Sequence, residues 1–369
     1  MTRRGASLAA AVLLTGVLTA CAEAADPPDD ADATSRSPGV PTVTATVASG
    51  LAVPWGIAFL PDGSAIVTER DSRRVLRLIP TSEGEAPQAA EIIELGEIEE
   101  AVPEVEAGLL GVAVSPDFAA DNTLFFYATT DDDNTVFKVT LDGDELGEPT
   151  PILTGIPKGV IHDGGRLEFG PDGFLYVSTG ETGDPSQAQD FRSLAGKILR
   201  ITTEGDPAPG NPEPDSPVWS LGHRNVQGLA FDDAGKLWAS EFGDSTFDEL
   251  NLVTPGGNYG WPLIEGTGGE PDYVDPLLTW STEDASPSGL AFADGTLWMA
   301  ALRGARLWQI PLTGERPGEP VGLLAGEYGR IRTVVTTPDG DLWVATSNRD
   351  GRGDPAEDDD RILLVSLGD

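Results

Sequence analysis

The chain contains two histidines, and each stands in a short polar stretch that is rich in glycine. His162 is followed by Asp163-Gly-Gly-Arg166, and the second stretch, residues 222–228, reads GHRNVQG. A neutral imidazole can accept a proton near neutral pH, and arginine binds carboxylates through its planar fork. The two stretches therefore predict general-base chemistry next to a group that binds an anion.

These stretches lie between copies of a repeated strand pair. Each copy has a short apolar strand, a tight turn that is often Pro-Asp-Gly, and a second strand with alternating apolar residues, which is typical of a β-hairpin. The six copies span 57–70, 112–129, 167–180, 229–243, 290–302 and 334–347. Hairpins recurring every 40 to 55 residues or so indicate propeller blades. We therefore expect an all-β chain folded as a six-bladed β-propeller, because a sandwich would not explain so long a repeat.

The polar residues outside the repeat occupy equivalent places in several copies. His162 and residues 222–228 precede the third and fourth copies, residues 329–332 (GRIR) precede the last, and Arg303 follows the fifth. Loops at one end of a propeller meet at its axis, so we expect the following residues to converge there: His162, Arg224, Asn225, Gln227, Arg303, Arg330 and Arg332. Such an arginine cluster predicts a site for a multiply charged anion and favours a neutral histidine beside it.

His223 has a different expected role from His162. Alternation along the strand points His223 away from its neighbour Arg224. We therefore expect His223 to pack behind the loop and to hold the backbone of Arg224 by a hydrogen bond.

Several long motifs occur in an order that resembles a known family. They span residues 162–181, 193–201, 222–231, 248–262 and 329–340, and the likeness extends from Val53 to the C-terminus. The chain resembles the soluble quinoprotein aldose sugar dehydrogenases, the glucose/sorbosone dehydrogenase family. The resemblance implies a six-bladed propeller that binds pyrroloquinoline quinone (PQQ) and Ca²⁺ and oxidises aldose sugars, with an external electron acceptor.

The resemblance also implies roles for individual residues. His162 would be the base that takes the proton of the anomeric hydroxyl while hydride passes to the quinone, and Arg224 would lie near the developing negative charge. The implied cofactor contacts are Arg224, Asn225, Gln227, Arg303, Arg330 and Arg332. Glu106 and Glu181 stand where the glucose-oxidising type has a glutamine and an aspartate near substrate or cofactor, so the preferred sugar stays open.

Calcium would be bound in two places according to the same resemblance. The ion next to PQQ would take backbone carbonyls from residues 241–244, with Gly243 and Asp244 as ligands. A second, structural ion would use Glu249 and Tyr259, although a solvated turn explains Asp248-Glu249 equally well. The acidic stretch 348–361 lacks the ligand spacing of an EF-hand, and we expect it to be an exposed loop.

Two other classes of function compete with this one. The first is a non-catalytic propeller lipoprotein that binds a sugar or a protein, since a fold alone does not determine an activity. The second is a calcium-dependent propeller hydrolase acting on a lactone, which would need metal-ligating side chains at the axis. His162 together with the arginines favours the dehydrogenase, because placing like charges close together is unfavourable and would give a non-catalytic propeller no benefit.

The N-terminus has the features of a bacterial lipoprotein signal. Arg3-Arg4 precedes an apolar run, residues 8–20, and the run ends at Cys21, the single cysteine of the chain. This predicts a signal peptide with a lipobox over residues 1–21, a disordered tether over 22–41 and the propeller over 42–369. The protein would then be exported and anchored by lipid to the outer face of the cell membrane. Ordinary secretory cleavage near Cys21 is the alternative.

The chain is strongly acidic. Its formal net charge is −38, and it becomes −40 once residues 1–21 are removed. Such a surface repels nucleic acid and anionic lipid headgroups. We therefore expect no nucleic-acid partner, and membrane contact only through the lipid anchor. Solubility is the simplest explanation of the acidity.

Replacing the lipidated residue tests the anchor. A Cys21→Ser chain should leave the membrane fraction, because acyl chains on that cysteine would be its means of attachment. Fractionation of cells followed by immunoblotting measures the change. Retention of the variant in the membrane would contradict the prediction.

Overall fold

Strands make up nearly all of the regular structure in residues 40–81 and 89–368, the part of the chain that the computed structural model describes. The two short helices there are α1 (Phe118–Asp121) and a 3-10 helix (Pro185–Gln189). Neither is long and apolar enough to cross a membrane. The predicted signal peptide, Cys21 and residues 22–39 of the predicted tether lie outside the described residues, so the anchor stays a prediction.

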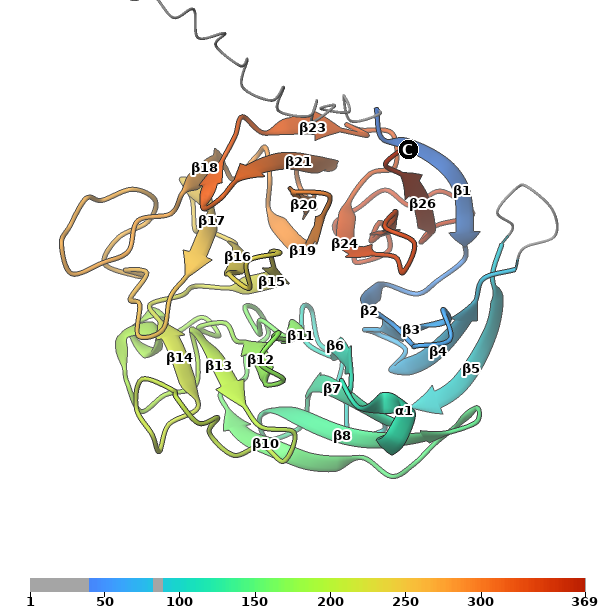
Figure 1. Ribbon diagram of the computed structural model, residues 1–369, viewed down its shortest axis with the longest axis horizontal. Coiled ribbons are helices and arrows are strands. Elements are labelled where there is room, and N and C mark those ends of the chain that lie inside the picture. Colours follow the sequence, from blue (N-terminus) through green and yellow to red (C-terminus); the bar gives the residue numbers. More distant parts are fainter. Residues whose placement is uncertain (1–39, 82–88, 369) are drawn as a thin grey trace, which may run out of the picture. The chain divides into compact units, whose positions relative to one another are not determined.

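The strands form six antiparallel sheets, and each sheet is one blade around a central axis (Figure 1). Blade 1 consists of β2 (Pro54–Phe59), β3 (Ala65–Glu69), β4 (Arg74–Ile79) and β5 (Glu91–Glu97). Blade 2 consists of β6 (Leu109–Val114), β7 (Thr123–Thr129), β8 (Asn134–Asp142), β9 (Glu145–Leu146) and β10 (Thr150–Ile156). Blade 3 consists of β11 (Leu167–Phe169), β12 (Leu175–Ser178), β13 (Lys197–Ile201) and β14 (Val218–Leu221).

The second half of the ring repeats this arrangement. Blade 4 consists of β15 (Val226–Phe231), β16 (Leu237–Glu241), β17 (Phe247–Val253) and β18 (Leu278–Ser281). Blade 5 consists of β19 (Pro287–Ala293), β20 (Thr296–Ala301), β21 (Arg306–Thr313), β22 (Arg316–Pro317) and β23 (Val321–Leu323). Blade 6 consists of β24 (Ile331–Thr336), β25 (Leu342–Thr346), β26 (Ile362–Ser366) and the N-terminal β1 (Thr42–Ala48). The predicted six-bladed β-propeller is therefore confirmed.

The hydrophobic core consists of six clusters, and each fills the space between two adjacent blades. Large side chains recur at one position of the second strand in successive blades, including Trp238, Trp298 and Trp343, all of which are buried. A hairpin cannot bury both of its faces alone, so each blade gains its core from its neighbours. This dependence explains why the repeat in the sequence persists around the whole ring.

The inner strands approach one another too closely at the axis for most side chains. A Cβ on Gly111 would lie 2.2 Å from the carbonyl oxygen of Gly165, and one on Gly228 would lie 2.3 Å from that of Ser288. The third blade has Arg166 at the corresponding position instead. Its guanidinium crosses the axis: Nε donates to the carbonyl of Gln227 in the neighbouring blade at 2.8 Å, and Nη2 donates to Oγ1 of Thr333 in the opposite blade at 3.4 Å. Arg166 thus lies in the central channel, between the two ends of the ring.

The channel below this arginine is lined mainly by residues with aliphatic and aromatic side chains, but it contains one carboxylate. A cavity of about 370 Å³ is lined by the inner strands of all six blades, and Glu168 is its acidic residue. Burial raises the pKa of Glu168 to about 7, although the positive charge of Arg166 opposes the shift. The folded protein therefore retains a proton on Glu168 that the unfolded chain releases near pH 4.5.

Replacing Glu168 with glutamine tests whether the pKa of this residue is raised in the folded protein. A carboxyl group whose pKa is higher in the folded state than in the unfolded chain stabilises the fold fully at pH values below its unfolded pKa. This contribution is lost as the pH rises through the folded pKa. Between pH 4.5 and pH 7 the wild type should lose up to about 3 kcal/mol of unfolding free energy relative to Glu168→Gln. Urea unfolding of both proteins at several pH values measures the difference. A difference that stays constant with pH would contradict the assignment.

Candidate active site

A second cavity, of about 440 Å³, lies at the end of the ring where the predicted site residues were expected. Its lining comes from loops of several blades: Glu106, His162, Arg224, Asn225, Phe242, Gly243, Asp244, Asp248, Thr282, Ser286, Arg303, Arg330 and Arg352. Eight of the predicted residues are among them. The structure therefore brings the two polar stretches of the sequence, His162 and residues 222–228, to one site.

His162 is held at its backbone and at its ring by two carboxylates. Its N–H donates to Oε2 of Glu106 at 3.0 Å, and its ring Nδ1 pairs with Oε1 of Glu181. The residue has a φ of 60°, in the left-handed region that few side chains adopt and that often marks a functional position. With Nδ1 paired to a carboxylate, Nε2 is the ring atom left to accept a proton.

Glu181 lies at the site but reaches it through His162. The resemblance put it near substrate or cofactor, but its side chain is buried behind His162 and does not line the cavity. Its second oxygen, Oε2, has no hydrogen-bond partner among the described residues. Glu181 therefore acts on the site through the orientation of His162. Glu106, in contrast, does line the cavity, as expected.

Arg224 enters the cavity from the loop before β15. Its backbone N–H donates to Oε1 of Glu241, and its Nη2 lies 3.2 Å from Oδ1 of Asp244. The guanidinium carbon lies 5.4 Å from the ring centroid of Trp261. Its Nε is buried and has no partner among the described residues. A buried N–H donor without a partner is uncommon and indicates a missing acceptor at this point.

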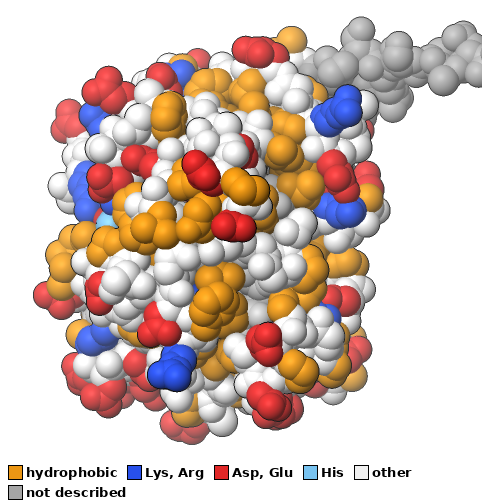
Figure 2. All heavy atoms as spheres, turned by 90° about the vertical axis from the view of Figure 1, so that its left-hand side faces the viewer, with side chains coloured by type: hydrophobic (Ala, Val, Ile, Leu, Met, Phe, Trp, Pro, Cys, Tyr) orange, Lys and Arg blue, Asp and Glu red, His pale blue; other side chains and the backbone are white. Residues whose placement is uncertain are grey.

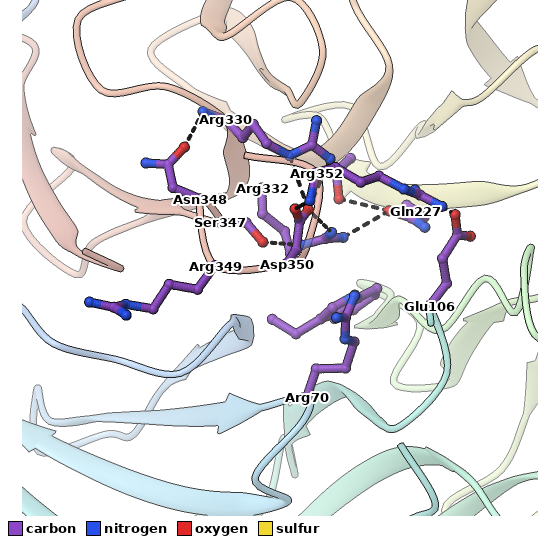
Figure 3. Close-up of polar contacts among 12 residues, drawn as sticks. Arg70, Glu106, Gln227, Arg330, Arg332, Ser347, Asn348, Arg349, Asp350 and Arg352 are labelled. Carbon is purple, nitrogen blue, oxygen red and sulfur yellow. Dashed lines mark hydrogen bonds and ion pairs between the residues drawn. The ribbon is translucent and has the colours of Figure 1, made fainter. Parts of the chain in front are cut away.

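Arg330 and Arg332 converge on one carboxylate, as Figure 3 shows. Nη2 of Arg330 and Nη2 of Arg332 lie 2.9 and 3.3 Å from Oδ2 of Asp350. Burial lowers the pKa of Arg332 to about 10, and the charge of the nearby Arg70 adds to the effect. Both arginines in turn hold the pKa of Asp350 below its ordinary value, against the effect of burial. The pair therefore already binds one carboxylate.

Other predicted cofactor contacts lie at different depths. Gln227 lies below the cavity, where its Oε1 accepts from Nη1 of Arg332 at 3.3 Å. Asn225 lines the cavity, but its Oδ1 also accepts from the backbone of Gly164 at 3.1 Å and so joins two loops. Arg303 lies at the exposed rim, 3.1 Å from Glu283. The structure brings Arg224, Arg303 and Arg330 to one cavity, with Arg332 and Gln227 as a layer beneath them.

The acidic stretch 348–361 is largely exposed, as expected, but three of its acidic side chains are not. Asp359, Asp360 and the side chain of Asp350 are buried, and they accept hydrogen bonds from arginine side chains and backbone N–H groups. The same stretch carries Arg352, whose Nη1 lies 2.7 Å from Glu106 at the cavity. Sequence reasoning missed both Asp350 and Arg352, since an acidic run normally indicates a solvated loop.

The segment after β16 forms part of the cavity wall. Phe242, Gly243 and Asp244 all line it, and the carbonyl oxygens of Gly243 and Asp244 have no hydrogen-bond donor within residues 40–81 and 89–368. Asp248 lies next to them, with its pKa raised to about 6 by burial. Oxygen atoms of this kind are the ligands that calcium prefers.

The two residues expected to bind the second calcium ion, Glu249 and Tyr259, differ in whether they are free to do so. Glu249 is buried and near Glu241, and burial together with that charge raises its pKa to about 8. The hydroxyl of Tyr259 is already used, since it donates to the carbonyl of Leu252 at 2.7 Å and accepts from the backbone of Thr254. No group of three or more His, Cys, Asp or Glu side chains suited to a metal occurs in the described part of the chain. The second ion therefore stays a prediction.

His223 is buried, but it does not bond to the backbone of Arg224 as expected. Its Nδ1 lies 2.8 Å from Oε2 of Glu241, its Nε2 lies 2.9 Å from Oγ of Ser220, and its ring stacks on Tyr259. Glu241 is the residue that accepts the N–H of Arg224. His223 therefore holds Arg224 indirectly, by fixing Glu241.

The fold and the cavity together define a propeller protein with an arginine-lined cavity at one end of its axis. The pattern of the Glucose / Sorbosone dehydrogenase family matches residues 51–363, and the chain belongs to this family. The PQQ-bound structure of the aldose sugar dehydrogenase from Streptomyces coelicolor is similar at 51% identity and a TM-score of 0.85, over 89% of this chain and 99% of that one. The aldose sugar dehydrogenase YliI of Escherichia coli is 31% identical over 81% of this chain and 88% of its own. Quinoprotein glucose dehydrogenase B of Acinetobacter calcoaceticus is 30% identical over 68% and 59%.

The role of His223 can be separated from catalysis by its effect on stability. His223→Ala should lower the free energy of unfolding by about 2–3 kcal/mol, because Glu241 would lose a partner while buried. His223→Gln can still donate an N–H to Glu241 and should lose less. Urea unfolding followed by tryptophan fluorescence measures both. An alanine variant as stable as the wild type would show that the pairing contributes nothing.

Proposed function

We propose that the protein is a PQQ- and calcium-dependent aldose dehydrogenase, which oxidises the anomeric carbon of the sugar to a lactone. The observation that carries the proposal is the position of His162 in a cavity lined by four arginines. The names of the relatives from Streptomyces and Escherichia coli support the same activity.

The residues of the cavity fit PQQ, which carries three carboxylates. Arg224, Arg303, Arg330 and Arg352 line the cavity, and Asp350 shows that the pair of Arg330 and Arg332 accepts a carboxylate. Arginine suits this task because its fork donates two parallel hydrogen bonds. The unpartnered Nε of Arg224 supplies a further donor for an acceptor in the cavity.

The carbonyls of Gly243 and Asp244 fit a calcium ion beside the cofactor. Both residues line the cavity, and the two oxygens lack hydrogen-bond donors in the described part of the chain. Backbone oxygens are normal ligands of this hard cation, which needs several oxygen ligands in all. The acidic side chains of Asp244 and Asp248 lie at the same place and add negative charge in its favour.

The protein's own residues then account for the proton transfer. PQQ supplies the hydride acceptor when it is bound. Nε2 of His162 takes the proton of the anomeric hydroxyl, and the carboxylate of Glu181 keeps the proton of the ring on Nδ1 and stabilises the imidazolium that forms. Glu106 holds the backbone of His162 in place. Arg224 provides positive charge where negative charge develops during the reaction.

Reconstitution tests this proposal directly. Purified protein given PQQ and Ca²⁺ should oxidise aldoses with an artificial electron acceptor. His162→Ala should still bind PQQ but reduce it about 10²–10⁴-fold more slowly on mixing with an aldose, because a general base contributes about that much. Arg330→Ala should instead bind PQQ about ten- to a hundredfold more weakly, since it removes a charge-assisted contact.

Single-turnover absorbance measures the reduction, and equilibrium dialysis measures binding. An inactive wild type with PQQ and Ca²⁺ bound would reject the function. A His162→Ala variant that reduces PQQ at the normal rate would reject the base.

A further inference from the structure

One carboxylate outside the cavity holds the loop that presents the carbonyls of Gly243 and Asp244. Oε1 of Glu265 accepts hydrogen bonds from the backbone N–H groups of Asp244, Ser245, Thr246 and Phe247, at 2.8, 3.1, 3.0 and 3.1 Å. Successive N–H groups that surround one anion in this way form an anion nest. Burial raises the pKa of Glu265, but these four bonds outweigh it and keep the pKa below its ordinary value.

The direction of these N–H groups determines the direction of the carbonyls. In a planar trans peptide, the N–H of one residue and the C=O of the residue before it point to opposite sides. Because the N–H groups of residues 244–247 point at Glu265, the carbonyls of residues 243–246 point away from it. Gly243 and Asp244 also line the cavity. The nest therefore turns carbonyl oxygens out of the loop at the place where the cation is proposed.

The curl of the loop is too tight for a side chain at its first residue. A Cβ on Gly243 would lie 1.7 Å from the carbonyl oxygen of Phe247 and 2.8 Å from Oε1 of Glu265. The N–H of Gly243 donates to Oδ1 of Asp248 at 2.9 Å, so every N–H from residue 243 to residue 247 has a carboxylate acceptor. Asp248 and Glu265 therefore hold the backbone of this loop in its curled conformation.

Glu265 reaches the loop from a long excursion between β17 and β18, residues 254–277. Its neighbour Gly266 donates its N–H to Oε1 of Glu249 at 2.7 Å, and Ile264 donates its N–H to the carbonyl of Gly260 at 2.9 Å. The residues on both sides of Glu265 are thus fixed. No repeat or motif in the sequence contains Glu265.

We propose that Glu265 is a positioning residue for the cation site: its carboxylate sets the carbonyls of Gly243 and Asp244 for calcium. The inference rests on the proposed function, because it assumes that this loop binds calcium. It predicts that loss of Glu265 weakens calcium binding without removing any ligand. Partners that orient metal ligands typically contribute ten- to a hundredfold to metal affinity.

The test measures calcium binding rather than turnover. Calcium alone is titrated calorimetrically into chelator-treated full-length protein, and PQQ binding is then followed by equilibrium dialysis at increasing calcium. The variants are Glu265→Ala, Glu265→Gln, which keeps one acceptor oxygen, and the control Glu270→Ala, an exposed acid on the same excursion. Melting temperatures in excess chelator report any general loss of stability.

In Glu265→Ala, the calcium concentration for half-maximal PQQ binding should rise about ten- to a hundredfold. It should rise less in Glu265→Gln and stay unchanged in Glu270→Ala. A Glu265→Ala protein with the calcium requirement of the wild type would overturn the role, even if its melting temperature fell. A wild type that binds no calcium with or without PQQ would overturn the calcium site itself, and the role of Glu265 with it. That outcome is distinct from a calcium-binding wild type that does not oxidise aldoses, which would reject only the proposed activity.

Discussion

Antiparallel pairing of β1 with β26 closes the ring, and the meeting of loops at the axis depends on that closure. The pairing extends from Thr42 opposite Ser366 to Ala48 opposite Ile362, so the start of the propeller completes its last blade. At the axis, the same seam is joined by a hydrogen bond from Oγ1 of Thr333 to the carbonyl of Trp55, at 2.6 Å. An open ring would leave blades 1 and 6 with one uncovered face each. Arg330 and Arg332 in blade 6 face the residues of blades 3 and 4 only because the ring is closed.

Closure brings positive charges together, and the structure must balance them. Burial and the charge of Arg332 lower the pKa of Arg166 to about 9. Removing cations from water is unfavourable unless opposite charges or hydrogen bonds compensate. Asp350 provides that compensation for Arg330 and Arg332, and the carbonyl of Gln227 provides part of it for Arg166. The arginines are thus held in place by the fold itself, which would reduce the reorganisation that binding of an anion requires.

The regular parts of this architecture could be predicted from the sequence. Hairpins that recur along the chain identified the blades, and the equivalent positions of the loops between them placed His162 and Arg224 at one end of the ring. The stretch 348–361 could not be placed in the same way, because it has no periodicity and its acidity suggested a solvated loop. The burial of its Asp350 side chain depends on Arg330 and Arg332, which precede it in the chain but meet it only in the folded ring. Partners of this kind leave no local signal in one sequence.

The carboxylates behind the cavity change the interpretation of the chain's acidity. Across the side of the molecule shown in Figure 2, acidic side chains are scattered among other residues, which agrees with a role in solubility. A second group is buried and acts on single atoms of the site: Glu181 on the ring of His162, Glu241 on the backbone of Arg224, and Asp350 on two guanidiniums.

Each of these three carboxylates fixes a residue that lines the cavity or lies directly beneath it, while Glu181 and Glu241 do not themselves line it. A buried carboxylate is a strong hydrogen-bond acceptor whose partners have few alternatives, so it restricts geometry more than a neutral group would. Some of the acidic residues in this strongly acidic chain therefore restrict the geometry of the arginine-rich site at the axis.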